Sequence, residues 1–194
     1  MKGRLFVISG PSGVGKGTLV SNVLSRRDGT WVAVSATTRS PREGEVDGVS
    51  YYFLSDEEFD RKVAEDDFLE WASVHDKRYG TLKSVVEEKL AEGIDVILEI
   101  DPQGAFKVRD KIPEAFLIFV QPPNFEELER RLVGRGTETS EQVERRLQTA
   151  RLELEQEPCY NVSLVNDDIE RATRELMSIL DGEVPSGNRT QDKK

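Results

Sequence analysis

The sequence predicts an α/β fold, with a mostly parallel sheet flanked by helices. Short apolar runs rich in Val, Ile and Phe alternate along the chain with longer segments of helical periodicity, as in βα units. A glycine-rich turn separates the first apolar run from the first helical segment. The 194 residues suit one domain, or one core that carries small inserts.

The individual elements follow from the periodicity of the apolar residues. This alternation predicts helices on the faces of a sheet. We expect strands at residues 4–9, 31–35, 94–100, 115–120 and 162–165. We expect helices at residues 16–25, 82–91, 124–133, 140–155 and 168–180.

Two stretches interrupt the alternation and predict inserts over the core. Residues 36–80 are dense in turn residues and aromatic residues, and residues 133–140 form a bend rich in Arg, Gly and Thr. The polar, turn-rich tail at residues 183–194 is expected to be disordered. We therefore expect one domain at residues 3–182, with a core of about 3–34, 82–132 and 156–182, an insert of about 35–81 and a lid of about 133–155.

One short helix is predicted inside the longer insert. Ser55 and Glu58 have the spacing of a capping box, in which each side chain binds the backbone N–H of the other residue. Leu54 and Phe59 have the spacing of a hydrophobic staple. Both patterns indicate that a helix begins directly after Ser55.

Composition and charge exclude several classes of function. The net charge of -10 argues against non-specific binding to nucleic acid or to an anionic membrane. No apolar run approaches the roughly 18 residues of a membrane span, and the apolar start is too short for a signal peptide, so we expect a cytoplasmic protein. The single cysteine, Cys159, excludes an internal disulfide and is expected to be at least half-buried. The single histidine, His75, leaves no His-based metal site or Ser-His-Asp triad and is expected in a surface loop.

The turn after the first strand has the composition of a phosphate-binding loop (P-loop). Its glycines allow successive backbone N–H groups to face an anion, and the helix that follows adds the positive end of its dipole. Lys16 is expected to contact the β- and γ-phosphates of a nucleotide. A plain glycine-rich turn is the alternative, but strand, spacing, lysine and helix occur together here. The expected phosphate-binding residues are Gly10, Pro11, Ser12, Gly13, Val14, Gly15, Lys16, Gly17 and Thr18.

One residue of this loop departs from the usual pattern. A P-loop lysine is normally followed by Ser or Thr, whose hydroxyl binds Mg²⁺. This chain has Gly17 at that position and Thr18 after it, an ending familiar from adenylate kinases. No protein ligand for the metal is therefore predicted, and Mg²⁺ is expected to be held through phosphates and water.

Several stretches outside the loop occur in an order typical of one enzyme family. They are SATTRSPREGE at 35–45, FLEW at 68–71, YGT at 79–81, EIDPQG at 99–104, GRGTE at 134–138 and VNDD at 165–168. Together with the P-loop they make residues 3–182 closely resemble guanylate kinases. The resemblance implies a P-loop NTPase core, a GMP-binding insert and a short lid. It also implies transfer of the γ-phosphoryl group of ATP to GMP, with ATP and Mg²⁺ as cofactors.

The resemblance places the acceptor site mainly in the insert, and the chemistry of its residues agrees. Arg39 and Arg42 can bind phosphate oxygens in a forked arrangement, with Tyr51 as a hydroxyl donor, although solvated or ion-paired arginines are the alternative. Guanine presents an O6 acceptor and donors at N1 and N2, so it requires hydroxyls and carboxylates opposite them. The expected substrate-binding residues are Ser35, Arg39, Arg42, Tyr51, Glu70, Tyr79, Thr81 and Asp101.

Within this set, Glu70 and Asp101 can supply the carboxylates, and Ser35 and Thr81 can supply the hydroxyls. Such a site should reject AMP, because adenine would leave the carboxylates unpaired, and lost polar contacts can discriminate by about 10⁴-fold. For Glu70 alone, a partly exposed strand residue is the alternative interpretation.

The resemblance also implies the catalytic groups. A GMP phosphate oxygen is already a nucleophile at neutral pH, so catalysis is expected to depend on positioning and on neutralising charge. Asn166 and Asp167 match positions that border the adenine of ATP, with a helix cap as the alternative. Arg145 is expected to be solvated. The expected catalytic residues are Lys16, Arg42, Arg135 and Arg146.

Two other functions are left open by these residues. Guanylate-kinase-like domains in scaffold proteins have lost catalysis and bind partner proteins, but here Lys16 and the loop glycines are intact. A small P-loop kinase for another phosphorylated substrate is the second alternative, and the base-reading residues argue against it. We expect GMP, dGMP and ATP as ligands, and neither nucleic acid nor a membrane as a partner. The oligomeric state is not predicted.

Overall fold

The computed structural model describes residues 2–133 and 140–183, and the chain divides into two compact units. We call the first the hairpin unit; it comprises the chain up to Leu5, Gly29–Leu98 and Gln103–Ala115. We call the second the P-loop unit; it comprises Phe6–Asp28, Glu99–Pro102 and the chain from Phe116 onward. Each unit is described by itself.

The P-loop unit contains parallel strands whose residues are almost all apolar. β1 (Leu5–Ser9), whose first residue belongs to the hairpin unit, pairs with β8 (Phe116–Gln121), and β8 pairs with β9 (Val162–Val165). Both pairings are parallel. Phe6 lies opposite Phe116, and Ile118 lies opposite Val162. Continuous apolar runs are typical of parallel strands that helices cover on both faces.

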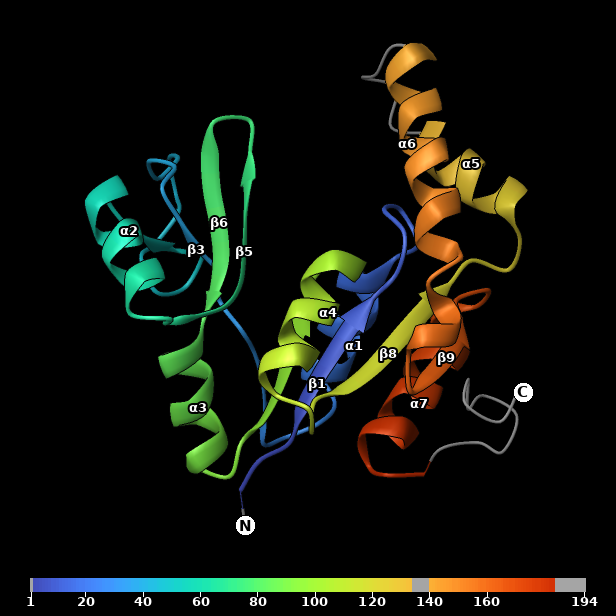
Figure 1. The fold of residues 1–194 in the computed structure, drawn as a ribbon. Helices are drawn as coiled ribbons and strands as arrows, with labels where there is room; N and C mark the ends of the chain where they lie inside the picture. The colour runs from blue at the N-terminus through green and yellow to red at the C-terminus, as the bar shows by residue number, and fades with distance from the viewer. Residues whose placement is uncertain (1, 134–139, 184–194) are drawn as a thin grey trace. The chain divides into compact units, whose positions relative to one another are not determined.

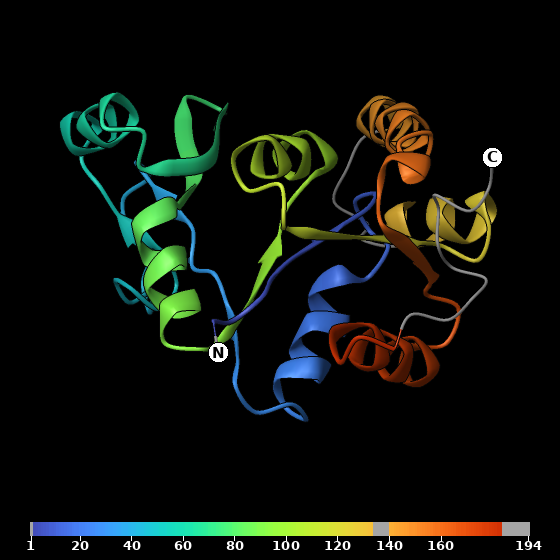
Figure 2. The ribbon, with the colours of Figure 1, turned by 60° about the horizontal axis from the view of Figure 1, so that its bottom comes forward.

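Four helices of the described P-loop unit flank these strands. They are α1 (Lys16–Leu24), α5 (Phe125–Val133), α6 (Ser140–Leu154) and α7 (Ile169–Leu180). Figure 2 shows α1 and α7 side by side, and Asn22 of α1 donates a 3.3 Å hydrogen bond to Thr173 of α7. Arg26 and Glu170 add a bidentate ion pair between them. The strand that precedes the P-loop and the helix that follows it are therefore both packed in place.

The hairpin unit contains two sets of strands. β2 (Thr30–Val32) pairs in parallel with β7 (Asp95–Glu99), whose last residue belongs to the P-loop unit. The second set is a four-stranded sheet in the order β4-β3-β6-β5. Its strands are β3 (Ala36–Thr37), β4 (Tyr52–Phe53), β5 (Phe68–Val74) and β6 (Lys77–Leu82). Figure 1 shows β5 and β6 as a long hairpin.

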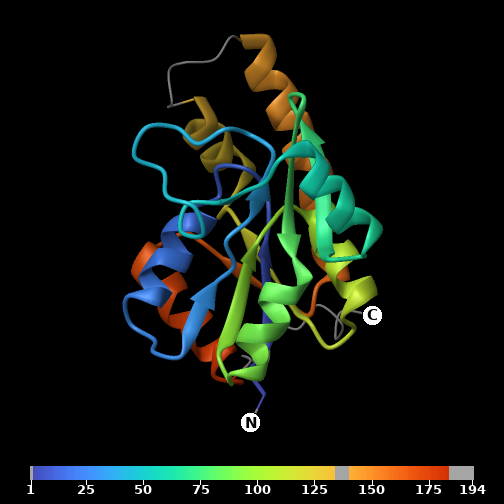
Figure 3. The ribbon, with the colours of Figure 1, turned by 90° about the vertical axis from the view of Figure 1, so that its left-hand side faces the viewer.

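Three helices belong to the hairpin unit: α2 (Asp56–Ala64), α3 (Lys83–Ala91) and α4 (Pro102–Lys111), of which Pro102 lies in the P-loop unit. The capping box predicted for α2 is confirmed, with Ser55 as the N-cap and Glu58 returning the bond. Phe59 of α2 stacks on Phe68 of β5, with ring centroids 4.4 Å apart. This contact packs α2 against the hairpin (Figure 3).

The predicted α/β class is confirmed, and the core elements lie within a few residues of their predicted bounds. The sequence did not predict α4 or the strands of the insert, and β2 ends three residues before the predicted strand does. Cys159 is exposed, which makes the prediction of a buried thiol wrong, because the short 3₁₀ turn Glu157–Cys159 leaves its last residue at the surface. His75 lies in the exposed turn of the hairpin, as predicted. Among the described residues, no helix is long and apolar enough to cross a membrane.

Candidate active site

The loop after β1 adopts backbone conformations that require glycine. Gly10, Gly13 and Gly15 have φ values of 139°, 83° and 97°. A Cβ at Gly10 would lie 2.3 Å from the Val120 carbonyl oxygen, so a side chain does not fit there. No side chain caps the N-terminus of α1, and its first backbone N–H groups are therefore available to an anion.

Lys16 lies on the first turn of α1 and reaches back over the loop. Its ammonium group donates hydrogen bonds to the carbonyl oxygens of Gly10, at 2.6 Å, and Pro11, at 3.1 Å. Burial lowers the pKa of Lys16, while Glu99, Glu153 and Asp101 oppose that shift. The loop thus combines backbone donors with a cation, which is a suitable environment for phosphate.

Two carboxylates beside this lysine were not predicted. Desolvation raises the pKa of Glu99, at the end of β7, and Lys16 opposes the shift. Burial likewise raises the pKa of Glu153 on α6, opposed by Lys16 and by the Ser12 backbone N–H. Glu153 follows Arg146 by seven residues, which places both on nearly the same helix face. That spacing was the one signal in the sequence that could have identified Glu153.

Helix α6 contacts the P-loop through Arg146. An Nη2–H group of Arg146 donates a 2.9 Å hydrogen bond to the Ser12 hydroxyl. The neighbouring Arg145 is 78% exposed and forms an ion pair with Glu141, as predicted for a solvated residue. The predicted catalytic residue Arg135 lies outside the described residues. The predicted catalytic residue Arg146 therefore lies beside the loop.

A second feature of the P-loop unit is a pocket beside the loop. The buried side chain of Asn166 donates a 2.8 Å hydrogen bond to the Val14 carbonyl oxygen. Arg131, which was not predicted, donates to the carbonyl oxygens of both Val14 and Asn166 at 3.3 Å. The cap of α7 is Asp168, so neither Asn166 nor Asp167 is the capping residue. The pocket has a volume of about 500 Å³ and is lined by Gly13, Gly15, Thr18, Arg131, Asn166, Asp167, Asp168 and Ile169.

In the hairpin unit, the predicted phosphate-binding arginine Arg39 is paired with an unpredicted partner. Glu45 accepts two hydrogen bonds from the Arg39 guanidinium, at 2.8 and 2.9 Å, and one from the Arg42 backbone N–H at 2.7 Å. The Arg39 side-chain hydrogen bonds hold the pKa of Glu45 at about 2. The Tyr51 ring lies 5.3 Å from the Arg39 guanidinium carbon and 6.1 Å from the Tyr79 ring.

Three of the predicted substrate residues therefore lie together, namely Arg39, Tyr51 and Tyr79. Arg42 is exposed at the surface of the same loop. The ion pair that the sequence left open as an alternative for Arg39 is present. Glu45 binds one donor on each of the two terminal nitrogens of Arg39, so it holds the guanidinium in a fixed orientation.

The predicted base-reading residues Glu70 and Thr81 are cross-strand neighbours. The buried Thr81 hydroxyl donates a 2.8 Å hydrogen bond to a carboxylate oxygen of Glu70. Ser35 is half-buried just before β3, and its carbonyl oxygen accepts a 2.9 Å bond from the Tyr52 N–H. Asp101 belongs to the P-loop unit and is exposed. Its carboxylate is one of the three that oppose the lowering of the Lys16 pKa by burial.

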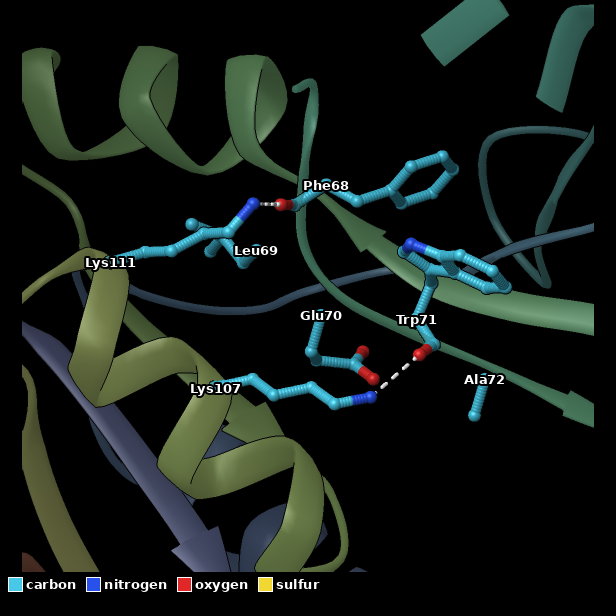
Figure 4. Close-up of a pocket in the computed structure, with 7 residues that line it drawn as sticks. All are labelled: Phe68, Leu69, Glu70, Trp71, Ala72, Lys107 and Lys111. Atoms are coloured by element: carbon cyan, nitrogen blue, oxygen red, sulfur yellow. Dashed lines mark hydrogen bonds between the residues drawn. The ribbon is translucent and has the colours of Figure 1, made fainter. Parts of the chain in front are cut away.

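Beside Glu70 the hairpin unit has a pocket of about 410 Å³ (Figure 4). Its lining combines the edge of β5 with two lysines of α4. In Figure 4, the Glu70 carboxylate and the Lys107 ammonium group point toward each other inside this pocket. The lining residues are Phe68, Leu69, Glu70, Trp71, Ala72, Lys107 and Lys111.

Comparison with known proteins gives one consistent family. A family model described as guanylate kinase matches residues 2–183. The chain is 53% identical over 177 residues to the guanylate kinase of Thermobifida fusca, covering 91% of this chain and 90% of the relative. It is 48% identical over 191 residues to that of Caldanaerobacter subterraneus subsp. tengcongensis, covering 98% and 93%. The crystal structure of guanylate kinase from Anaplasma phagocytophilum matches with a TM-score of 0.69 and 33% identity, covering 94% of this chain and 86% of that one.

Proposed function

The chain belongs to the guanylate kinase family, and from this premise we infer that it transfers the γ-phosphoryl group of ATP to GMP, forming ADP and GDP. A P-loop alone occurs in enzymes of many functions, so it does not identify the acceptor. The observation that carries the proposal is the paired hydroxyl and carboxylate of Thr81 and Glu70 on one hairpin. The Glu70 carboxylate can accept from the N1 and N2 donors of guanine, and the hydrogen bond from Thr81 holds that carboxylate in place.

The P-loop unit supplies the proposed ATP site. Backbone N–H groups of residues 12–18 and the Lys16 ammonium group bind the β- and γ-phosphates. The pocket that contains Arg131, Asn166 and Asp167 takes the nucleoside, since it adjoins the glycines of the loop. Arg146, already hydrogen-bonded to Ser12, is placed to bind phosphate oxygens. Arg135 is proposed as its partner from the family resemblance.

Mg²⁺ is proposed to bind beside Gly17. The Glu99 carboxylate oxygens lie 3.5 and 3.6 Å from the position that a Cβ of residue 17 would take. A carboxylate is a ligand type that Mg²⁺ favours, so this site fits the metal although the usual hydroxyl is replaced by Gly17. Among the described residues no cluster of three or more acidic, His or Cys side chains could hold a metal. Phosphate oxygens and water would complete the coordination, and the bound ion would neutralise phosphate charge.

The hairpin unit supplies most of the proposed GMP site. Arg39, Arg42, Tyr51 and Tyr79 bind the phosphate, with Glu45 keeping the Arg39 guanidinium in position. The base lies against Glu70, Thr81 and Ser35, and the family resemblance implies Asp101 as a second carboxylate. None of these base contacts requires the ribose 2′-hydroxyl, so dGMP is proposed as a second acceptor.

The chemistry needs no general base, because the GMP phosphate is already an anionic nucleophile. An oxygen of this phosphate forms the new bond to the γ-phosphorus while the bond from the γ-phosphorus to the β-γ bridging oxygen breaks, and ADP leaves with the electron pair. Lys16, Arg42, Arg135 and Arg146 neutralise the negative charge of the three phosphoryl oxygens. The net charge of -10 repels anions at long range, so the anionic substrates must be held by these local cationic side chains, and the single cysteine is consistent with the proposed cytoplasmic location.

A substrate panel tests the proposed function. ADP formation from ATP and Mg²⁺ would be measured with GMP, dGMP, AMP, CMP and UMP as acceptors. We expect strong activity with GMP, activity with dGMP, and little with the other three. A folded protein that binds GMP but transfers phosphate to no acceptor would instead be a binding module.

A further inference from the structure

Strand β5 carries an irregularity directly beside Glu70. Phe68 pairs with Leu82 and Glu70 pairs with Thr81, so two steps along β5 match one step along β6. Leu69 is the extra residue, and its side chain is fully buried. Such a β-bulge bends a strand and re-aims a neighbouring side chain, here the Glu70 carboxylate.

Two lysines of α4 bind the backbone of β5 on either side of Glu70. Lys111 donates a 2.7 Å hydrogen bond to the carbonyl oxygen of Phe68, and Lys107 donates a 3.0 Å bond to that of Trp71. Figure 4 shows both bonds. The lysines are four residues apart on α4 and therefore share a helix face. Lys111 also forms an ion pair with Asp66, which precedes β5.

The two contacts depend on the bulge. Successive carbonyl groups of a regular strand point to opposite sides, so carbonyls three residues apart face opposite directions. The extra residue Leu69 reverses this relationship and lets Phe68 and Trp71 present carbonyl groups to the same helix. Because β5 is the edge strand of its sheet, these groups face away from β6 and need other partners.

The other side of the bulge is fixed by close packing against β6. A Cβ at Gly80 would lie 2.7 Å from the Glu70 carbonyl oxygen and 2.7 Å from the Trp71 Cβ. β5 therefore approaches β6 as closely as a glycine allows, and the Thr81 hydroxyl reaches the Glu70 carboxylate. The backbone around Glu70 is held by β6 on one side and by two ammonium groups on the other.

We propose that Lys107 and Lys111 are positioning residues for base selectivity: they hold the bulge of β5 and thereby fix the Glu70 carboxylate where it binds the guanine N1 and N2 donors. This inference rests on the proposed function. Replacing the two lysines by residues without an ammonium group would remove the hydrogen bonds to the carbonyl oxygens of Phe68 and Trp71. The backbone of the bulge would then no longer be held by α4. The Glu70 carboxylate would then remain present but be misplaced.

The test uses Lys107→Met, Lys111→Met and the double variant of the full chain. kcat and KM would be measured with GMP and with IMP, which lacks the 2-amino group that a carboxylate binds. We expect the double variant to lose about tenfold in kcat/KM for GMP, because small misplacements of a substrate-binding group are costly. The loss for IMP should be smaller, and KM for ATP should not change. Lys→Arg variants keep a donor and should retain most of the GMP preference.

Two control variants, Lys89→Met and Glu70→Gln, separate the inference from a general loss of folding and from failure of the proposed function. Lys89→Met removes a lysine of the same unit that donates to the Glu92 side chain at 2.8 Å, and it should leave the GMP to IMP ratio unchanged. In a Glu70→Gln background, the lysine variants should add no further loss of preference. If Glu70→Gln abolishes the preference but the folded lysine variants keep it, the positioning role is wrong. If Glu70→Gln itself keeps the preference, the base-reading role of Glu70 is wrong and the inference falls with it.

Discussion

The hydroxyl group of Thr81 donates a hydrogen bond of 2.8 Å to the carboxylate of Glu70 across the β5–β6 hairpin. The two residues are register partners, and Thr81 is only 2% exposed. Thr81→Val keeps the shape of the side chain but removes its only polar group. A hydrogen bond to a charged group contributes about 1.5–3 kcal/mol, so we expect KM for GMP to rise roughly tenfold or more.

Steady-state kinetics at saturating ATP would measure this change. Thr81→Ser is the matched control, because it retains the hydroxyl while removing one methyl group. If the serine variant loses as much affinity for GMP as the valine variant, packing at position 81 matters and the hydroxyl does not.

Gly80 lies where the two strands come closest. A Cβ there would lie 2.7 Å from backbone and side-chain atoms of residues 70 and 71, and 2.8 Å from the Phe68 ring. Overpacking of this kind typically lowers the unfolding free energy by about 1–3 kcal/mol, and we expect that range for Gly80→Ala. Urea denaturation would measure it. Gly44→Ala serves as a control for added side-chain volume, since a Cβ there meets nothing within 4 Å, although its φ of 84° adds strain of its own.

Much of the core was predictable because its helices and strands are marked by patterns of residues that lie close together in the sequence. Apolar periodicity located α1, α3, α5, α6 and α7 to within one residue at most ends. The capping box at Ser55 located the start of α2 because it depends on two residues three apart. In contrast, α4 was missed, since Pro102 and Gly104 resemble turn residues. Proline in fact suits the first position of a helix.

The details of the site could not be predicted, because they depend on contacts between side chains and backbone groups whose positions in space the sequence does not show. The carboxylate of Glu45 was recognisable only as one of many surface charges, yet it binds both Arg39 and the Arg42 backbone. Lys107 could not be related to β5, because a helix that was not predicted carries it. The bulge at Leu69 was equally hidden, because the strands of the insert were not predicted and no register could be assigned to them.

Arg146 and Arg145 offer a comparison between adjacent residues with the same side chain. Arg146 binds Ser12 of the P-loop at 2.9 Å, whereas Arg145 is 78% exposed and pairs with Glu141. Arg146→Ala removes a cation from the proposed phosphate site, and we expect kcat to fall about 100-fold, as for the loss of a transition-state donor. Arg145→Ala should retain nearly all activity. Equal losses in both variants would show that Arg146 has no special role, and melting temperatures would establish that both variants are folded.

The Arg39–Glu45 pair predicts a dependence of stability on pH. The Arg39 side-chain hydrogen bonds hold the pKa of Glu45 at about 2, below its ordinary value of 4.5. A depressed carboxyl pKa stabilises the folded chain at pH values above the ordinary pKa, and this contribution is lost as pH falls through the folded value. The difference in unfolding free energy between the wild type and Glu45→Gln should therefore be constant near neutral pH and shrink between pH 4.5 and 2.

Urea denaturation at a series of pH values would measure that difference. The side chains of Arg39 and Glu45 are 15% and 21% exposed, so high salt should reduce the difference in part at every pH. Glu43→Gln is the control, since it removes the same charge from the same exposed loop two residues earlier. If the Glu43 and Glu45 variants follow the same pH profile, the effect comes from net charge. Only a distinct profile for Glu45 would assign it to the bond with Arg39, and the same variant should then raise KM for GMP, because the guanidinium that binds the phosphate is no longer held in place.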